Sequence, residues 1–90
     1  MYKLSSTNQF EKDYKLCKKR NYKLELLHTV FGHLEKNGFL SAKYKPHKLT
    51  GNYEGFWECH IRPDWLLIWL QNDDLITITL TRTGTHADLF

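Results

Sequence analysis

The sequence predicts an α+β fold with the element order β-α-α-β-β-β, in which an antiparallel sheet carries a two-helix hairpin on one face. Two observations predict it: the N-terminal part spaces its apolar residues at helical intervals, and the C-terminal part holds wholly apolar and alternating runs that are typical of strands. Turn residues separate these runs. Ninety residues allow one domain, over residues 1–90, with one core.

The chain begins with a short predicted edge strand over Tyr2–Ser5, followed by a helix that runs to about Arg20. Either Asn8 or Ser6 can cap this helix, and Glu11, three residues after Asn8, completes a capping box. The helical spacing predicts a buried stripe of Phe10, Tyr14 and Cys17.

A second helix is predicted over Tyr22–Asn37, with Gly38 as its left-handed C-cap. Its apolar residues recur at helical spacing: Leu24, Leu27, Val30, Phe31 and Leu34. Because the connection between the two helices is short, they should pack as an antiparallel hairpin. The segment Phe39–Lys48 is expected to be a loop or extended chain.

Three strands are predicted at about residues 55–61, 65–71 and 74–82, with turns at Arg62-Pro63-Asp64 and Asn72-Asp73. The run Trp65–Leu70 is wholly apolar, which predicts a strand covered on both faces. Alternation along the other two strands sorts their side chains by face. The set expected to face the core is Trp57, Cys59, Ile61, Ile76, Ile78 and Leu80, whereas Phe56, Glu58 and His60 share the opposite face.

Composition limits the possible functions. The net charge of +3 permits a polyanionic partner without requiring one. No stretch approaches the roughly 20 apolar residues of a membrane span, and the N-terminal residues lack the apolar run of a signal peptide, so we expect a cytoplasmic protein. Cys17 and Cys59 are too few for a disulfide framework or a cysteine-rich zinc site, and we expect both to pack in the core.

The polar chemistry gathers at strand ends and loops. Three histidines lie outside the helices, with two carboxylates and an arginine near them: His47, His60, His86, Glu58, Asp64 and Arg82. These residue types suit RNA cleavage by the substrate's own 2′-hydroxyl, because imidazoles can move protons near neutral pH and a guanidinium can stabilise a phosphorane-like transition state. Such a reaction needs no metal and no other cofactor. The same histidines could instead bind zinc or serve the structure alone.

Three segments carry a resemblance to a known family: PHKLTG, GFWECHIRPDWLLIW and LTRTGTHADLF. Their combination and order resemble the YafQ branch of the RelE/ParE toxin superfamily. The resemblance implies a RelE-like, microbial-ribonuclease-like sandwich. It also implies a bacterial type II toxin that cuts mRNA, usually on the translating ribosome, and that a cognate antitoxin protein silences.

The resemblance also assigns candidate residues. His47, His60, Asp64 and His86 match the family's histidines and acid, Arg82 its phosphate-binding arginine, and Phe90 the terminal phenylalanine that helps to hold the substrate base. Glu58 stands where many members have Asp, and other members also have Glu there.

These matches lead to hypothetical roles. His86 is the general acid, Glu58 or His60 is the base, and Asp64 orients an imidazole or favours its protonated form. Arg82 stabilises the transition-state phosphate, and His47 and Lys48 bind phosphate or support the base. Lys45, in the same basic segment, is a further candidate for RNA contact. Tyr53 and Phe56 are candidates to flank the cleft.

Two alternatives remain open at this point. ParE-like relatives share the fold but act as non-catalytic binding proteins, and incubation of the pure protein with RNA would distinguish them. The histidine-rich set could also form a metal-binding domain, which activity in EDTA would exclude.

Overall fold

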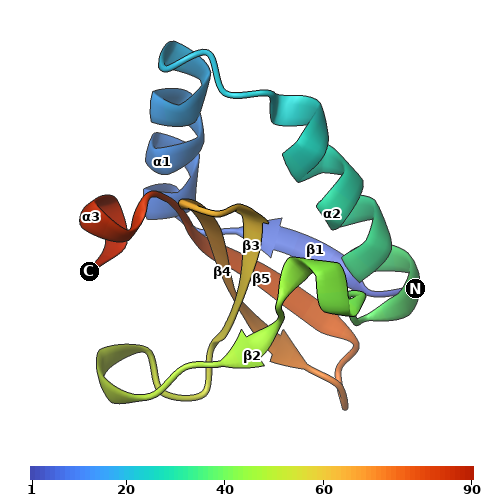
Figure 1. Ribbon diagram of the computed structural model, residues 1–90. Helices are drawn as coiled ribbons and strands as arrows, with labels where there is room; N and C mark the ends of the chain where they lie inside the picture. Colours follow the sequence, from blue (N-terminus) through green and yellow to red (C-terminus); the bar gives the residue numbers. More distant parts are fainter.

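The computed structural model describes residues 1–90 and contains one five-stranded sheet with two long helices on one face (Figure 1). The helices and strands are β1 (Lys3–Ser6), α1 (Asn8–Lys19), α2 (Leu24–Asn37), β2 (His47–Lys48), β3 (Trp57–Arg62), β4 (Trp65–Asn72), β5 (Thr77–Gly84) and α3 (His86–Leu89). The predicted α+β class and the two-helix hairpin are confirmed. None of the helices has the length and the apolar character that crossing a membrane requires.

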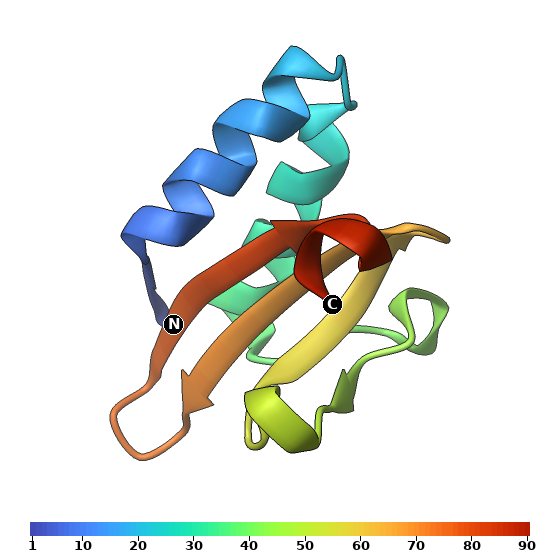
Figure 2. The same cartoon turned by 90° about the vertical axis from the view of Figure 1, so that its left-hand side faces the viewer.

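The strand order in the sheet is β1-β5-β4-β3-β2, so the last strand in the sequence lies between the first strand and β4. The pairs β2–β3, β3–β4 and β4–β5 are antiparallel, as predicted, but β1 pairs with β5 in parallel, and the sheet is therefore mixed. Figure 2 shows the two long helices together on one side of the sheet and α3 beside β5. A four-residue edge strand carries no sequence signal for its direction, which is why the prediction missed the parallel pair.

Helix α1 begins where its backbone donors find a partner. Thr7 is the N-cap, and its side chain accepts a hydrogen bond from the Phe10 backbone N–H at 3.0 Å. The predicted caps at Asn8 or Ser6 are therefore wrong: Asn8 is the first helical residue, and the Ser6 hydroxyl donates to the Glu11 carboxylate.

Helix α2 begins at Leu24, two residues later than predicted, because Asn21 takes a left-handed conformation (φ 61°) in the connection from α1. It ends at Gly38, which is the predicted left-handed cap with φ 71°. A β-carbon at Gly38 would lie 2.2 Å from the Tyr2 ring, so another residue there would have to displace this ring in addition to adopting a left-handed conformation.

The main core lies between the helices and the sheet. It buries Phe10, Cys17, Leu27, Val30, Leu34, Cys59, Trp65, Leu67, Trp69, Ile78 and Leu80, among others. A second, smaller cluster of Leu66, Ile68 and Leu89 lies apart from it, and Leu49, Tyr53 and Phe56 pack against this cluster. Strand β4 is therefore covered on both faces from Trp65 to Trp69, as predicted, whereas Leu70 is exposed because neither cluster reaches it.

Strand β5 begins later than predicted and contains one extra residue. Trp69 pairs with Leu80 and Ile68 pairs with Arg82, so Thr81 forms a β-bulge between them. Ile76 precedes the strand, has φ 55° and is exposed, so the prediction that it faces the core is wrong. The reason is that the β4–β5 turn spans residues 73–76 rather than two residues.

Candidate functional site

One row of side chains crosses four strands on the sheet face that carries the cluster of Leu66, Ile68 and Leu89. The register pairs His47 with Glu58, Glu58 with Ile68 and Ile68 with Arg82. Residues directly opposite in antiparallel strands project to the same face, so these four side chains share one face. The bulge at Thr81 brings Arg82 into the row, because without it the next residue after Leu80 would pair with Ile68.

Glu58 is the centre of one half of the site. It is only 4% exposed, and its Oε1 lies 3.2 Å from His47 Nε2 and 3.9 Å from His60 Nε2. The other ring nitrogens bond to the backbone: His47 Nδ1 donates to the Lys45 carbonyl at 2.9 Å, and His60 Nδ1 donates to the Pro63 carbonyl at 3.3 Å. Both imidazoles therefore present Nε2 to the same carboxylate oxygen.

His86 comes from α3 and meets the β3–β4 turn. Asp64 Oδ1 accepts hydrogen bonds from the His86 backbone N–H at 2.9 Å and from His86 Nδ1 at 2.6 Å. The backbone hydrogen bond first, and the side-chain one second, hold the pKa of Asp64 below its usual range, so Asp64 is a carboxylate at neutral pH. With Nδ1 occupied, Nε2 is the nitrogen of His86 that can exchange a proton with a substrate. The His86 ring centre is 5.9 Å from that of His60.

Arg82 is held by a buried carboxylate of α1. Asp13 is 7% exposed and accepts from Arg82 Nε at 2.7 Å, from Arg82 Nη2 at 3.3 Å and from the Thr83 backbone N–H at 3.2 Å. The hydrogen bond to Asp13 is the main cause that raises the pKa of Arg82, and partial burial opposes it. Arg82 Nη1 donates to the Tyr53 hydroxyl at 3.3 Å, so the guanidinium is fixed from two sides.

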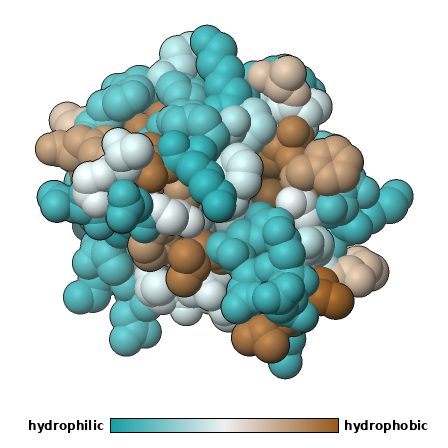
Figure 3. Space-filling model, turned by 90° about the horizontal axis from the view of Figure 1, so that it is seen from below, coloured by the Kyte–Doolittle hydropathy of each residue, from teal (hydrophilic) through white to brown (hydrophobic).

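Aromatic rings border the site beside Arg82. The Tyr53 ring lies edge-on to Phe56, with centroids 6.0 Å apart, and edge-on to Phe90 at 5.6 Å. Phe90 is 64% exposed, and its ring centre is 6.5 Å from that of His86. Figure 3, which views this side of the molecule from below, shows hydrophobic side chains set among hydrophilic ones. An exposed aromatic ring beside an imidazole is a surface on which a nucleobase can stack.

Helix α3, which carries His86, is fixed at both of its sides. Thr85 and Asp88 form a capping box, with Thr85 Oγ1 accepting from the Asp88 N–H at 3.1 Å and Asp88 Oδ2 accepting from the Thr85 N–H at 2.9 Å. Asp88 also accepts two hydrogen bonds from Arg20, at 2.6 and 3.1 Å. The Arg20 guanidinium, followed by the Thr85 backbone N–H, holds the pKa of Asp88 far below its usual range.

The structure brings most of the predicted residues together, but not the lysines. His47, Glu58, His60, Asp64, Arg82, His86 and Phe90 lie along one continuous surface, linked by the contacts above. Lys48 pairs with Trp57 and its Nζ lies 5.7 Å from the centre of that ring, so it projects to the other face of the sheet from His47. Lys45 is exposed, and its carbonyl rather than its ammonium group contributes a contact, to His47.

Sequence reasoning missed Asp13 and the Arg20–Asp88 pair. A signal for Asp13 was present, because it lies three residues after Phe10 and four before Cys17, on the stripe that packs against the sheet. Tyr14, which was assigned to this stripe, is only half-buried. No group of three or more His, Cys, Asp or Glu side chains is arranged to hold a metal ion.

The sequence of this chain is similar to those of known proteins. A family model described as the bacterial toxin YafQ of a type II toxin-antitoxin system matches residues 2–90. The mRNA interferase toxin YafQ of Escherichia coli strain K12 is 40% identical over 85 residues, which are 93% of this chain and 90% of the relative.

Solved structures match over the whole fold. A crystal structure of YafQ from E. coli strain BL21(DE3) has a TM-score of 0.92 at 35% identity and covers 100% of this chain and 99% of its own. A crystal structure of the E. coli DinJ–YafQ toxin-antitoxin complex has a TM-score of 0.89 at 37% identity, covering 99% and 97%. The match of the family model from residue 2 to residue 90 establishes that the chain belongs to the YafQ family of bacterial type II toxin-antitoxin toxins.

Proposed function

We propose that this toxin is an endoribonuclease that cleaves mRNA by attack of the RNA's own 2′-hydroxyl. The observation that carries the proposal is the placement of His60 and His86 with ring centres 5.9 Å apart, each supported by a carboxylate, on the face that also presents Arg82. The similar E. coli YafQ is named an mRNA interferase, which supports the same substrate.

The proposed reaction distributes two proton transfers between the two imidazoles. His60 takes the 2′-hydroxyl proton, the 2′-oxygen bonds to phosphorus, and the bond from phosphorus to the 5′-oxygen breaks. His86 starts protonated and gives its Nε2 proton to that leaving oxygen. The products are a 2′,3′-cyclic phosphate and a 5′-hydroxyl. Arg82 neutralises charge on the phosphorane-like transition state.

Burial favours His60 over Glu58 as the base. The Glu58 side chain is 6% exposed and the His60 side chain is 24% exposed, so the imidazole is the group that a substrate hydroxyl can approach. Glu58 then stabilises the cation that forms on His60, and His47, 3.2 Å away, supports Glu58. Asp64 orients His86 by accepting its Nδ1–H, which leaves Nε2 directed to the substrate. We assign Phe90 to base contact and Lys45 to phosphate contact.

The partners follow from the same proposal. The similar DinJ–YafQ toxin-antitoxin complex supports a cognate antitoxin that binds this chain. We place the activity in the cytoplasm, on mRNA carried by translating ribosomes.

The test is to map cleavage ends on free mRNA and on translating ribosomes, for the wild type and for His86→Ala. Loss of a general acid should lower the single-turnover rate by ~10²-fold or more. Cleavage that leaves a 2′,3′-cyclic phosphate and persists in EDTA supports the mechanism. Equal rates for the two proteins would remove His86 from it, and absence of cleavage on both substrates would favour a binding toxin without catalysis.

A further inference from the structure

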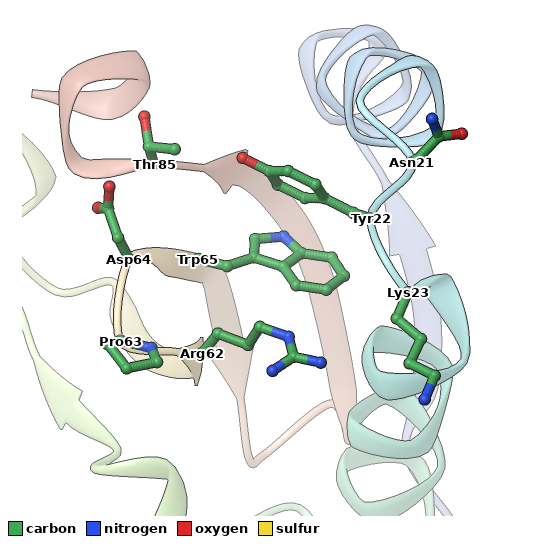
Figure 4. A pocket seen from close by; sticks show the side chains of 8 residues that line it. All are labelled: Asn21, Tyr22, Lys23, Arg62, Pro63, Asp64, Trp65 and Thr85. Atoms are coloured by element: carbon green, nitrogen blue, oxygen red, sulfur yellow. The ribbon is translucent and has the colours of Figure 1, made fainter.

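A cavity of about 490 Å³ adjoins the candidate site but is separate from the row of side chains described above. It lies between the α1–α2 connection, the β3–β4 turn and the start of α3 (Figure 4). Its lining residues are Asn21, Tyr22, Lys23, Arg62, Pro63, Asp64, Trp65 and Thr85, and we call it the hairpin pocket. Its volume lies within the range of about 300–1,000 Å³ that small-molecule sites occupy.

Two cations line the hairpin pocket without a partner in the chain. Each of the other two arginines is paired, Arg20 with Asp88 and Arg82 with Asp13, whereas Arg62 makes no ion pair and no side-chain hydrogen bond. Lys23 is also exposed and unpaired. Figure 4 shows the Arg62 side chain extending beneath Trp65 toward the side on which Lys23 lies. An unpaired guanidinium and an ammonium group that line one cavity form a site for an anion with several acceptor oxygens.

An aromatic wall stands beside these cations. The Tyr22 ring packs against Trp65 with centroids 4.9 Å apart, and Trp65 is buried. Tyr22 is therefore fixed on one side by Trp65, while part of its side chain remains exposed to solvent. Proteins bind single-stranded nucleic acids with this combination: a base stacks on the aromatic ring, and the phosphate contacts the cationic groups.

Asp64 is the one acidic residue in the lining, and its position connects the hairpin pocket to the candidate site. Its Oδ1 is bonded to both the backbone and the ring of His86. In Figure 4 its carboxylate points toward Thr85, away from Arg62 and Lys23. The two unpaired cations therefore determine the sign of the cavity, and Asp64, which lines it, is bonded to His86.

We propose that the hairpin pocket binds a nucleotide of the same RNA chain, next to the cleaved linkage. Its phosphate lies between Arg62 and Lys23, and its base lies against Tyr22. The inference rests on the proposed function for the identity of the ligand. It adds a substrate-binding subsite outside the catalytic row and predicts that affinity depends on the length of the RNA.

The experiment measures binding of 2′-O-methyl RNA, which cannot be cleaved, in a length series from the dinucleotide upward. Two double variants are compared: Lys23→Ala/Arg62→Ala, and the control Lys12→Ala/Lys36→Ala, which removes the same charge at exposed lysines outside the pocket. Fluorescence anisotropy at several salt concentrations gives the affinity and its salt dependence. For the longer oligomers, the pocket variant should bind about tenfold more weakly than the control, because charge-assisted hydrogen bonds are lost.

The salt dependence provides a second readout. Loss of one phosphate contact on a single strand should lower the slope of log K against log salt by about 0.7 relative to the control. The proposal is overturned if the two variants bind every oligomer alike, or if the pocket variant loses as much affinity for the dinucleotide as for longer RNA. Because no cleavage is measured, absence of ribonuclease activity in the wild type would refute the proposed function without deciding this result.

Discussion

Arg82 enters the site with Nε and Nη2 already bonded to a carboxylate. Asp13 occupies these two nitrogens and Tyr53 contacts the third, Nη1, so the guanidinium has one orientation before any substrate arrives. A preoriented donor stabilises developing charge without the cost of reorganising in the transition state. The carboxylate of Asp13 also offsets the positive charge of Arg82. Arg82 should therefore act more through hydrogen bonds of fixed geometry to the phosphate than through long-range attraction of RNA.

Replacing Asp13 tests this role. In Asp13→Asn the charged acceptor is lost while the shape is kept, so Arg82 and the Thr83 N–H lose their carboxylate partner. On the proposed function, we expect the single-turnover cleavage rate at saturating RNA to fall about tenfold or more, because Arg82 loses its fixed orientation. Asp74→Asn, at an exposed and unpaired carboxylate, is the matched control. Equal rates in the two variants would show that Arg82 needs no support from Asp13.

The Asp64–His86 contact makes a prediction about titration. Since the pKa of Asp64 is depressed, the interaction is complete above the ordinary value of 3.8 and is lost only as the pH falls further. Carboxyl NMR should find the pKa of Asp64 below 3.8 in the wild type. In His86→Ala it should rise only part of the way back, because the backbone N–H remains as a donor.

Asp73 provides the internal reference for this titration. Its pKa is lowered by Gln71 and Tyr2, which the substitution at His86 does not touch. A His86→Ala spectrum in which Asp64 keeps its wild-type pKa would mean that the imidazole does not interact with Asp64 in solution.

At the scale of elements, α3 is only four residues long, and a helix this short is unstable without contacts to the rest of the protein. Its position depends on the capping box and on Arg20, which reaches it from the end of α1. The α1–α2 hairpin thus has a second task besides covering the core: it fixes the element that carries His86.

Removing Arg20 should therefore loosen α3. In Arg20→Ala, amide exchange in residues 86–90 should speed up, while exchange in α1 and β4 stays as in the wild type. The pKa of Asp88 should rise toward its ordinary value of 3.8, so the variant loses less stability than the wild type as the pH falls below that value, where the unfolded chain binds a proton at Asp88 that the native ion pair excludes. Lys19→Ala, at the neighbouring exposed cation, is the control. Unchanged exchange at the C-terminal residues would contradict the role given to Arg20.

The elements that sequence predicted are those whose signal is local. Helical spacing located α1 and α2 to within two residues, and the apolar run from Trp65 located the central strand. The bulge at Thr81 and the pairing of β1 with β5 depend on residues far apart in the chain, so no local pattern reports them. The capping pattern of Thr85 and Asp88 is local, but only two residues follow Asp88, too few for helical spacing to indicate a helix.

The candidate site divides in the same way. The histidines, Glu58 and Arg82 could be chosen as candidates from the chemistry of their side chains alone. The role of Asp13 could not, because it depends on α1 packing beside β5. Lys48 was grouped with His47 because the two are adjacent. Neighbouring side chains of a strand project to opposite faces of the sheet, so Lys48 lies on the other face from His47.

At the scale of the whole molecule, both cysteines lie in the main core, and neither can form a thiolate easily. Burial raises the pKa of Cys59 to about 12, and burial also raises the pKa of Cys17. Because the thiolate is the reactive form, a thiol reagent at about pH 8 should leave the folded protein unlabelled. Labelling should follow global unfolding, and both thiols should react at one common rate. Fast labelling of either cysteine in native buffer would show that the core opens locally around it.

The position of β5 in the sheet affects when the chain can complete its fold during synthesis. This strand lies between β1 and β4 and supplies Arg82, and the residues after it supply His86 and Phe90. The ribosome synthesises β5 and these later residues only after residues 1–76. A nascent chain that lacks them has an incomplete sheet and lacks both His86, the proposed general acid, and Arg82, the proposed phosphate-binding residue. On the proposed function, a newly made chain should therefore cleave no RNA until β5 and the residues after it have joined the fold, and this interval is available for an antitoxin to bind.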